Sequence, residues 1–135
     1  MTADRTSRPA GSPLVLAGLL AVAGATHLVR PAVYTGLIPR ALGDPRPWVL
    51  GSGAAELVCA AAVAAPVTRR AGALATAALL VAVWPGNLTM AVRMQRSRRP
   101  RTPRRTAALA VAWLRVPLQV PLVLWATRVA RAPRP

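Results

Sequence analysis

The sequence predicts an all-α protein: a transmembrane four-helix bundle with a proline-rich segment between the first two helices. The 135-residue chain is 54% hydrophobic, with a mean hydropathy of +0.40, yet its formal charge is +15. Four long apolar runs alternate with arginine-rich connections, the usual division between membrane spans and loops. Each run is close to the ~20 residues that a helix needs to cross the membrane. Barrel strands need only about 10 residues, so helices are the expected form.

The first expected span covers residues 13–29, after a polar, small-residue tail at 1–12 that we expect to be disordered. This span holds no formal charge, and His27 lies at its far end. Residues 30–47 follow and contain four prolines, a density that excludes a continuous helix. Because this segment keeps apolar residues and Tyr34, we expect it to lie along the membrane interface as a lid.

The second expected span covers residues 48–67 and contains Glu56. The third covers 71–92 and follows almost directly, so these two helices should form a tight antiparallel hairpin. The fourth covers 106–127 and contains Arg115. Together the spans form one transmembrane domain at residues 13–128, and a short C-terminal tail occupies 129–135.

All eighteen basic residues are arginines, and they lie mainly between the apolar runs. Residues 93–105 hold seven of them, which indicates a solvated basic loop or, as a sharper interpretation, a site for anionic lipid headgroups. The arginines are not interleaved with aromatic residues, so the pattern argues against nucleic acid as a partner. Seven arginines fall on the face with the termini and ten on the other face, which favours a cytoplasmic location for the latter.

Glu56 and Arg115 are the only formal charges within the four spans. A charge at the centre of a span costs about 2.5–3.5 kcal/mol, so such residues are functional candidates by default. At 1.5 Å per residue they lie ~12 and ~13.5 Å from the same membrane face. The sequence therefore predicts a direct pair, because a lone charge in hydrocarbon is costly. The pair either locks spans two and four together or lines a polar cavity.

Other polar residues favour the cavity, since they lie in the same half of the bundle. Prolines at positions 85, 117 and 121 should kink the helices there and free backbone carbonyls. The opposite half is almost purely Ala, Val and Leu, so the cavity should be closed at that end. Its candidate residues are His27, Tyr34, Ser52, Glu56, Asn87, Arg115 and Gln119, with no catalytic role assigned.

Some chemistry is excluded by composition. The chain has one His and one Cys, which is too few for a metal cluster. Cys59 has no second cysteine with which to form an intramolecular disulfide. Electrons for any redox reaction would therefore come from a bound cofactor or from a partner protein.

Several motifs, in this order along the chain, resemble those of small DoxX-like membrane proteins over roughly residues 22–128. The departures are Leu28 in place of an aromatic residue, Gly86 in place of Ala, and the arginine-rich loop. The resemblance implies a multi-pass protein of the bacterial cytoplasmic membrane. Some DoxX-type proteins are associated with quinone-linked thiosulfate oxidation or with membrane redox complexes. The matching motifs are Gly24-Ala25-Thr26-His27, Pro31-Ala32-Val33-Tyr34, Gly51-Ser52-Gly53-Ala54-Ala55-Glu56-Leu57, Trp84-Pro85-Gly86-Asn87 and Arg115-Val116-Pro117-Leu118-Gln119.

Three functions remain in competition. The first is a quinone- or small-molecule-binding subunit of a membrane redox assembly, in which Arg115, Gln119 and His27 bind a carbonyl and Glu56 handles a proton. It would work with a soluble or membrane redox partner. The second is a non-enzymatic scaffold whose buried pair is structural and whose basic loop docks a partner or anionic lipid. The third is a small transporter, which would need a homo-oligomer because four short spans rarely suffice alone.

Overall fold

The computed structural model describes residues 12–133, and this part of the chain is all-helical with no strands. Four α-helices follow one another, and three short 3₁₀ turns lie between the first two. The expected tail at 1–12 lies outside the described residues except for Ser12, and the last α-helix continues into the expected C-terminal tail. The elements are α1 (Pro13–Val29), η1 (Pro31–Val33), η2 (Thr35–Leu37), η3 (Arg40–Leu42), α2 (Pro45–Ala64), α3 (Arg69–Arg96) and α4 (Pro103–Arg131).

Three of the described helices, α2, α3 and α4, are long and apolar enough to cross a membrane. Helix α1 has 17 residues and meets this criterion only together with the following segment, from which it is bent by 98°. The described chain therefore has three candidate membrane spans, or four if α1 and its bent continuation count as one.

The prolines and caps explain where the helices begin. Helix α2 starts at Pro45, before the expected span at 48–67, because the first turn of a helix needs no N–H from proline. The carboxylate of Asp44 accepts a hydrogen bond of 3.0 Å from the backbone N–H of Arg46. In the same way the side chain of Thr102 accepts a bond at the start of α4. Helices α3 and α4 thus extend into the arginine-rich segment and leave only residues 97–102 between them.

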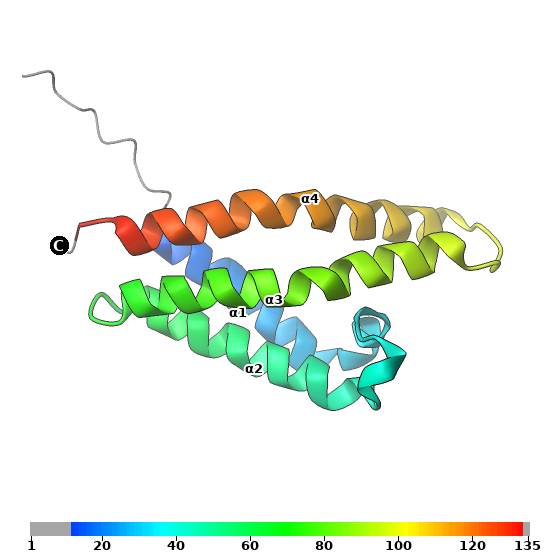
Figure 1. Cartoon of the computed structure of the whole chain (residues 1–135), viewed down its shortest axis with the longest axis horizontal. Helices are drawn as coiled ribbons and strands as arrows, with labels where there is room; N and C mark the ends of the chain where they lie inside the picture. Colours follow the sequence, from blue (N-terminus) through cyan, green and yellow to red (C-terminus); the bar gives the residue numbers. More distant parts are fainter. Residues whose placement is uncertain (1–11, 134–135) are drawn as a thin grey trace, which may run out of the picture.

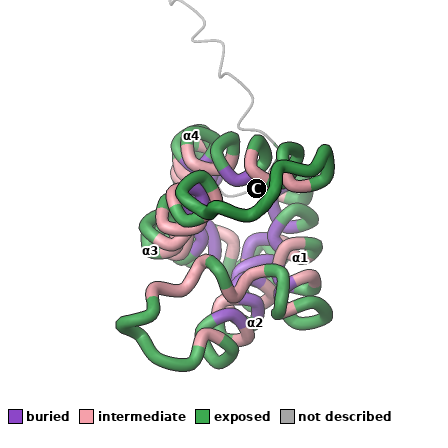
Figure 2. Tube along the Cα trace, turned by 90° about the vertical axis from the view of Figure 1, so that its right-hand side faces the viewer, coloured by how far each residue is buried: buried purple, intermediate pink, exposed green. Residues whose placement is uncertain are grey.

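Consecutive helices run antiparallel and pack side by side, α1 on α2, α2 on α3 and α3 on α4 (Figure 1). The end-on view in Figure 2 places α2 and α4 furthest apart, with α1 and α3 between them. The short turns η1 to η3 and the α3–α4 loop lie at one end of the molecule, whereas the α2–α3 turn and the C-terminus lie at the other (Figure 1). Below, these are called the polar end and the apolar end.

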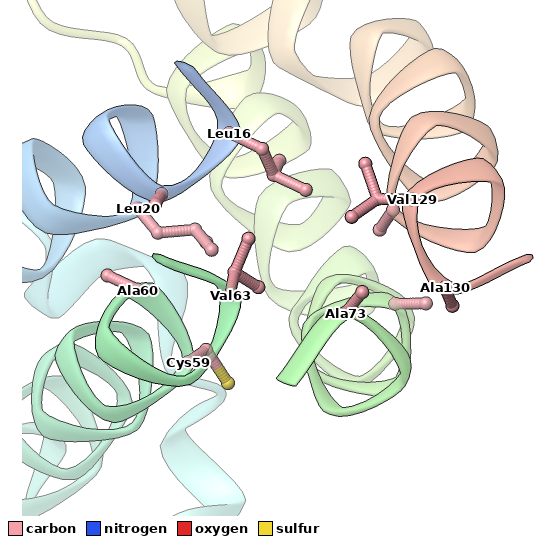
Figure 3. Close-up of a cluster of buried hydrophobic side chains, with 11 residues drawn as sticks. Leu16, Leu20, Cys59, Ala60, Val63, Ala73, Val129 and Ala130 are labelled. Atoms are coloured by element: carbon pink, nitrogen blue, oxygen red, sulfur yellow. The ribbon is translucent and has the colours of Figure 1, made fainter. Parts of the chain in front are cut away.

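The apolar end holds the hydrophobic core, to which all four helices contribute (Figure 3). Small residues allow close packing: a Cβ on Gly72 would lie 2.7 Å from Ala62, so the α2–α3 hairpin needs glycine there. The guanidinium of Arg69 donates to the carbonyls of Val63 and Ala64, at 3.0 and 3.1 Å, and satisfies the end of α2. The core residues are Leu16, Ala17, Leu20, Cys59, Ala60, Val63, Ala73, Ala77, Ala126, Val129 and Ala130.

Large apolar side chains also cover the outside of the helices. Val22 in α1, Val58 in α2 and Leu114 in α4 each expose more than 60% of their surface. An extended apolar exterior of this kind is unusual for a monomer in water and is typical of a surface that faces lipid or a partner.

Candidate functional site

The centre of the polar end is an ion pair between α1 and α2. The Nδ1 atom of His27 lies 2.9 Å from Oε2 of Glu56, and the two residues are only 5% and 9% exposed. The same Nδ1 lies 2.8 Å from the carbonyl oxygen of Ala23. Both neighbours are acceptors, so Nδ1 carries a proton. Its single N–H has two acceptors within reach, the carbonyl of Ala23 and Oε2 of Glu56, and Oε2 has no other hydrogen-bond partner within the described residues. A buried carboxylate oxygen thus keeps unused acceptor capacity.

Two glycines bring α1 and α2 close enough for this pair to form. A Cβ on Gly24 would lie 2.7 Å from the carbonyl oxygen of Gly53, and a Cβ on Gly53 would lie 2.7 Å from Cβ of His27. Each glycine precedes its ionisable partner by three residues, which places both on the same face of their helix. The helices therefore cross at the two glycines with His27 and Glu56 facing each other.

Tyr34 and Arg115 continue the site away from the pair. The ring of Tyr34 stacks on the imidazole of His27, with centroids 3.9 Å apart and an interplanar angle of 27°. The guanidinium carbon of Arg115 lies 5.7 Å from the centre of the Tyr34 ring, within the range of a cation–π contact. The site thus runs from Glu56 through His27 and Tyr34 to Arg115.

This arrangement corrects the expected direct pair between Glu56 and Arg115. Within the described residues Glu56 forms its ion pair with His27, whereas Arg115 lies over Tyr34. The physical reason is helix order: α2 packs on α1 and α3, and α4 packs mainly on α3. Matched depth therefore did not bring the two charges together, because their helices are not neighbours.

The segment with Tyr34 is fastened to α2 and α3 by hydrogen bonds to its backbone. Arg93 donates to the carbonyl of Ile38 at 2.9 Å, and the indole of Trp48 donates to the carbonyl of Leu42 at 3.1 Å. The turn η2 packs closely on α3, where a Cβ on Gly86 would lie 3.1 Å from the carbonyl oxygen of Leu37. These contacts hold the segment beside the ion pair.

Asn87 and Gln119 form a separate group between α3 and α4. The amide of Asn87 donates to Oε1 of Gln119 at 2.9 Å, and Nε2 of Gln119 donates to the carbonyl of Leu80 at 2.6 Å. In the opposite direction the indole of Trp84 donates to the carbonyl of Val116 at 3.0 Å. We call this group the α3–α4 seam.

Both seam helices continue through their prolines, and the seam's carbonyl acceptors lie close to them in sequence. A proline frees the carbonyl four residues before it, here those of Val81, Trp113 and Pro117. The seam's acceptors at Leu80 and Val116 are therefore not the carbonyls that the prolines free. The seven candidate residues thus divide into the ion-pair group and the seam. Ser52 is half-buried one turn before Glu56 and forms no hydrogen bond to either group in the described structure.

Sequence reasoning missed Gly24 and Arg93 as residues that build the site. A signal for the glycines exists, since Gly-x-x-His and Gly-x-x-Glu occur in consecutive helices. Nothing in the sequence separates Arg93 from the other arginines of its loop. Among residues 12–133, no three His, Cys, Asp or Glu side chains come together as metal ligands.

These features define a class: an all-helical protein with helices long and apolar enough to cross a membrane, and an ion pair buried between two of them. The chain belongs to the family described as "Domain of unknown function (DUF8561)", whose model matches residues 16–130. No curated protein and no solved structure matches it.

Proposed function

We propose that the protein is a DoxX-like transmembrane four-helix bundle of the bacterial cytoplasmic membrane, and that its polar end binds a quinone or a similar flat, carbonyl-bearing molecule. In this proposal it serves as a subunit of a membrane redox assembly. Three helices of sufficient length, the bent continuation of α1 and the apolar exterior support the membrane placement. The motifs around His27, Glu56 and Arg115 support the family resemblance.

The observation that carries the proposal is the buried pair of His27 and Glu56 beneath Tyr34. Ionisable groups are costly inside a membrane and are usually retained there for a function. Here Oε2 of the carboxylate has no polar partner except the imidazole, so it can accept a further hydrogen bond from a hydroxyl or a water molecule.

The residues present fit a flat ring with polar edges. The ring of Tyr34 already stacks on the imidazole of His27 and lies 5.7 Å from the guanidinium of Arg115, so an aromatic ring fits beside both groups. None of the residues of η1, η2 and η3 is fully buried, so displacing this segment exposes little core, although it breaks the hydrogen bonds that Arg93 and Trp48 donate to the segment. A ligand ring would then stack on His27 in place of Tyr34.

In that position Arg115 would donate a charged hydrogen bond to a ligand carbonyl, and Glu56 would accept a proton from a ligand hydroxyl. The quinone, when bound, supplies two-electron redox chemistry. The chain's own residues bind and orient it, exclude water, and hold a proton at the Glu56–His27 pair.

The test is binding of decylubiquinone to the purified protein in an uncharged detergent, followed by quenching of tryptophan fluorescence. We expect Arg115→Ala and Glu56→Gln each to weaken binding about tenfold or more, as expected for loss of a charged hydrogen bond. Arg128→Ala is the matched control, because Arg128 is exposed on the same helix at the apolar end. Absence of saturable binding, or equal binding by all variants, would overturn the proposal.

A second candidate function is a non-enzymatic scaffold whose ion pair only fixes α1 against α2. The close approach of Gly24 and Gly53 beside the pair favours it, since such packing needs no ligand. One double variant, His27→Leu with Glu56→Leu, distinguishes the two candidate functions. A scaffold stays folded and keeps its partners, whereas the quinone-binding protein stays folded and loses the ligand.

A further inference from the structure

The α3–α4 loop carries positive charge that nothing nearby in the chain neutralises. Residues 93–109 include seven arginines and no acidic residue. Of the chain's three acids, Asp44 caps α2 and Glu56 pairs with His27, and the third lies in the N-terminal tail. Closely spaced like charges repel one another, so this loop gains stability when it binds an anion.

Arg105 organises the loop. Its guanidinium donates to the carbonyls of Met94 and Ser97, at 3.1 and 2.9 Å, and also to those of Arg99 and Pro100. The carbonyls therefore turn inward around this side chain, and the loop folds back on the start of α4. The other six arginines of residues 93–109 are exposed: Arg93, Arg96, Arg98, Arg99, Arg101 and Arg104.

A hollow of about 60 Å³ lies beside Arg105, between the last turns of α3 and the first turns of α4. One water molecule needs ~10–15 Å³ on this measure, so the hollow has room for the four oxygens of a phosphate group. Its lining residues are mixed in character: two arginines, a serine, a threonine and a glutamine, together with the apolar Met94 and Leu109. The lining residues are Met94, Gln95, Ser97, Arg101, Arg105, Thr106 and Leu109.

We propose that this hollow binds the phosphate of an anionic phospholipid headgroup. Arginine is suited to phosphate because its planar fork donates two parallel hydrogen bonds. The hydroxyls of Ser97 and Thr106 supply neutral donors beside Arg101. Met94 and Leu109 offer an apolar border where a lipid's acyl chain would begin. The inference rests on the membrane placement proposed above, but not on quinone binding.

The position of the hollow agrees with a headgroup rather than a soluble phosphate compound. It lies where two long apolar helices meet a solvated basic loop, which is the headgroup level if α3 and α4 span the membrane. A soluble ligand would need no apolar border. The expected ligand is therefore a lipid such as phosphatidylglycerol, with its phosphate in the hollow and its chains along α3 and α4.

The experiment measures binding of short-chain phosphatidylglycerol to the full chain in an uncharged detergent, by native mass spectrometry and by the shift in thermal unfolding. Phosphatidylcholine and inorganic phosphate are the comparison probes. We expect one saturable site for phosphatidylglycerol, about tenfold weaker binding after Arg101→Gln, and weaker binding after Thr106→Val. Arg104→Gln is the matched control, because it removes the same charge from an exposed side chain outside the hollow. Arg105 is left unchanged, since it holds the loop together.

Several outcomes would overturn the proposal. Equal losses for Arg101→Gln and Arg104→Gln would show that only the net charge of the loop attracts lipid. Inorganic phosphate that binds as tightly as phosphatidylglycerol would make a soluble anion the ligand, and equal binding of phosphatidylcholine would remove the role of the charge. A protein that stays soluble without detergent would refute the membrane placement itself, and quinone binding affects none of these readouts.

Discussion

The two ends of the molecule are built from the same four helices but held together differently. At the apolar end Leu16, Val63 and Val129 interlock with alanines, and no charge lies in the core. At the polar end a buried ion pair, a stacked ring and an arginine take the place of this packing. Burying ionisable groups is costly unless they are paired, whereas apolar packing carries no such cost. The polar end therefore depends on specific partners, and the apolar end depends on shape.

The two groups of polar side chains at the polar end also differ in how many elements they connect. The α3–α4 seam is satisfied entirely between adjacent helices. The ion-pair group instead draws on α1, α2, the segment η1 to η3 and α4. A displacement of that segment would change the ion-pair group and leave the seam intact.

The largest expected effect comes from breaking the ion pair. His27→Ala leaves the carboxylate of Glu56 buried without its partner, and removal of one member of a buried pair costs about 3–5 kcal/mol. We expect a loss of this size in the free energy of unfolding, measured by titration with sodium dodecyl sulfate in mixed micelles. A loss below about 1 kcal/mol would show that the carboxylate is solvated or protonated without cost.

The next largest effect is expected from closing the space between α1 and α2 that lets the pair form. Gly53→Ala adds a Cβ that would lie 2.7 Å from Cβ of His27 and 2.9 Å from the carbonyl oxygen of Gly24, so α1 and α2 must separate. Overpacking of this kind should cost up to about 3 kcal/mol. Gly51→Ala is the control on the same helix, because its added Cβ meets nothing within 4 Å and should stabilise by about 0.5–1 kcal/mol. Similar effects of the two changes would contradict the close crossing.

A substitution at the apolar end should lower stability and leave ligand binding unchanged. Leu16→Ala removes a side chain that is 1% exposed and should lower the free energy of unfolding by about 2 kcal/mol, at the low end for such a change. Binding of decylubiquinone by the folded variant should equal that of the unchanged protein. A change in its affinity of tenfold or more would show that the two ends are not independent.

The smallest effect concerns the α3–α4 seam. Trp84→Phe removes the hydrogen bond to the carbonyl of Val116 and keeps most of the ring, so we expect a loss of only about 0.6 kcal/mol. Trp113→Phe serves as the control for loss of an indole from the neighbouring helix, where the side chain is 40% exposed. A loss above about 2 kcal/mol from Trp84→Phe alone would mean that this hydrogen bond positions more than the seam.

The sequence predicted which end of the molecule is polar, because burial of charge in an apolar run is visible without coordinates. It also predicted that Tyr34 lies in a segment next to His27, and the structure brings the two rings together. It predicted the wrong partner for Glu56, Arg115 in place of His27. Depth along a helix follows from residue spacing, whereas the partner depends on helix order and on rotation about each axis.

Glycine spacing contained part of the missing information. Gly24 and Gly53 precede His27 and Glu56 by the same three residues, and this places each glycine and its ionisable residue on one face. The division of the polar residues into two groups could not be predicted, since Arg115 and Gln119 share a helix face yet contact different elements.

The central claim is that Glu56 is paired with His27 and not with Arg115, and double-mutant cycles of unfolding free energy test it directly. One cycle combines His27→Ala with Glu56→Gln, and the other combines Arg115→Ala with Glu56→Gln. The structure predicts a coupling of about 1.5–3 kcal/mol in the first cycle and less than about 0.5 kcal/mol in the second. The reverse order of the two couplings would contradict the account.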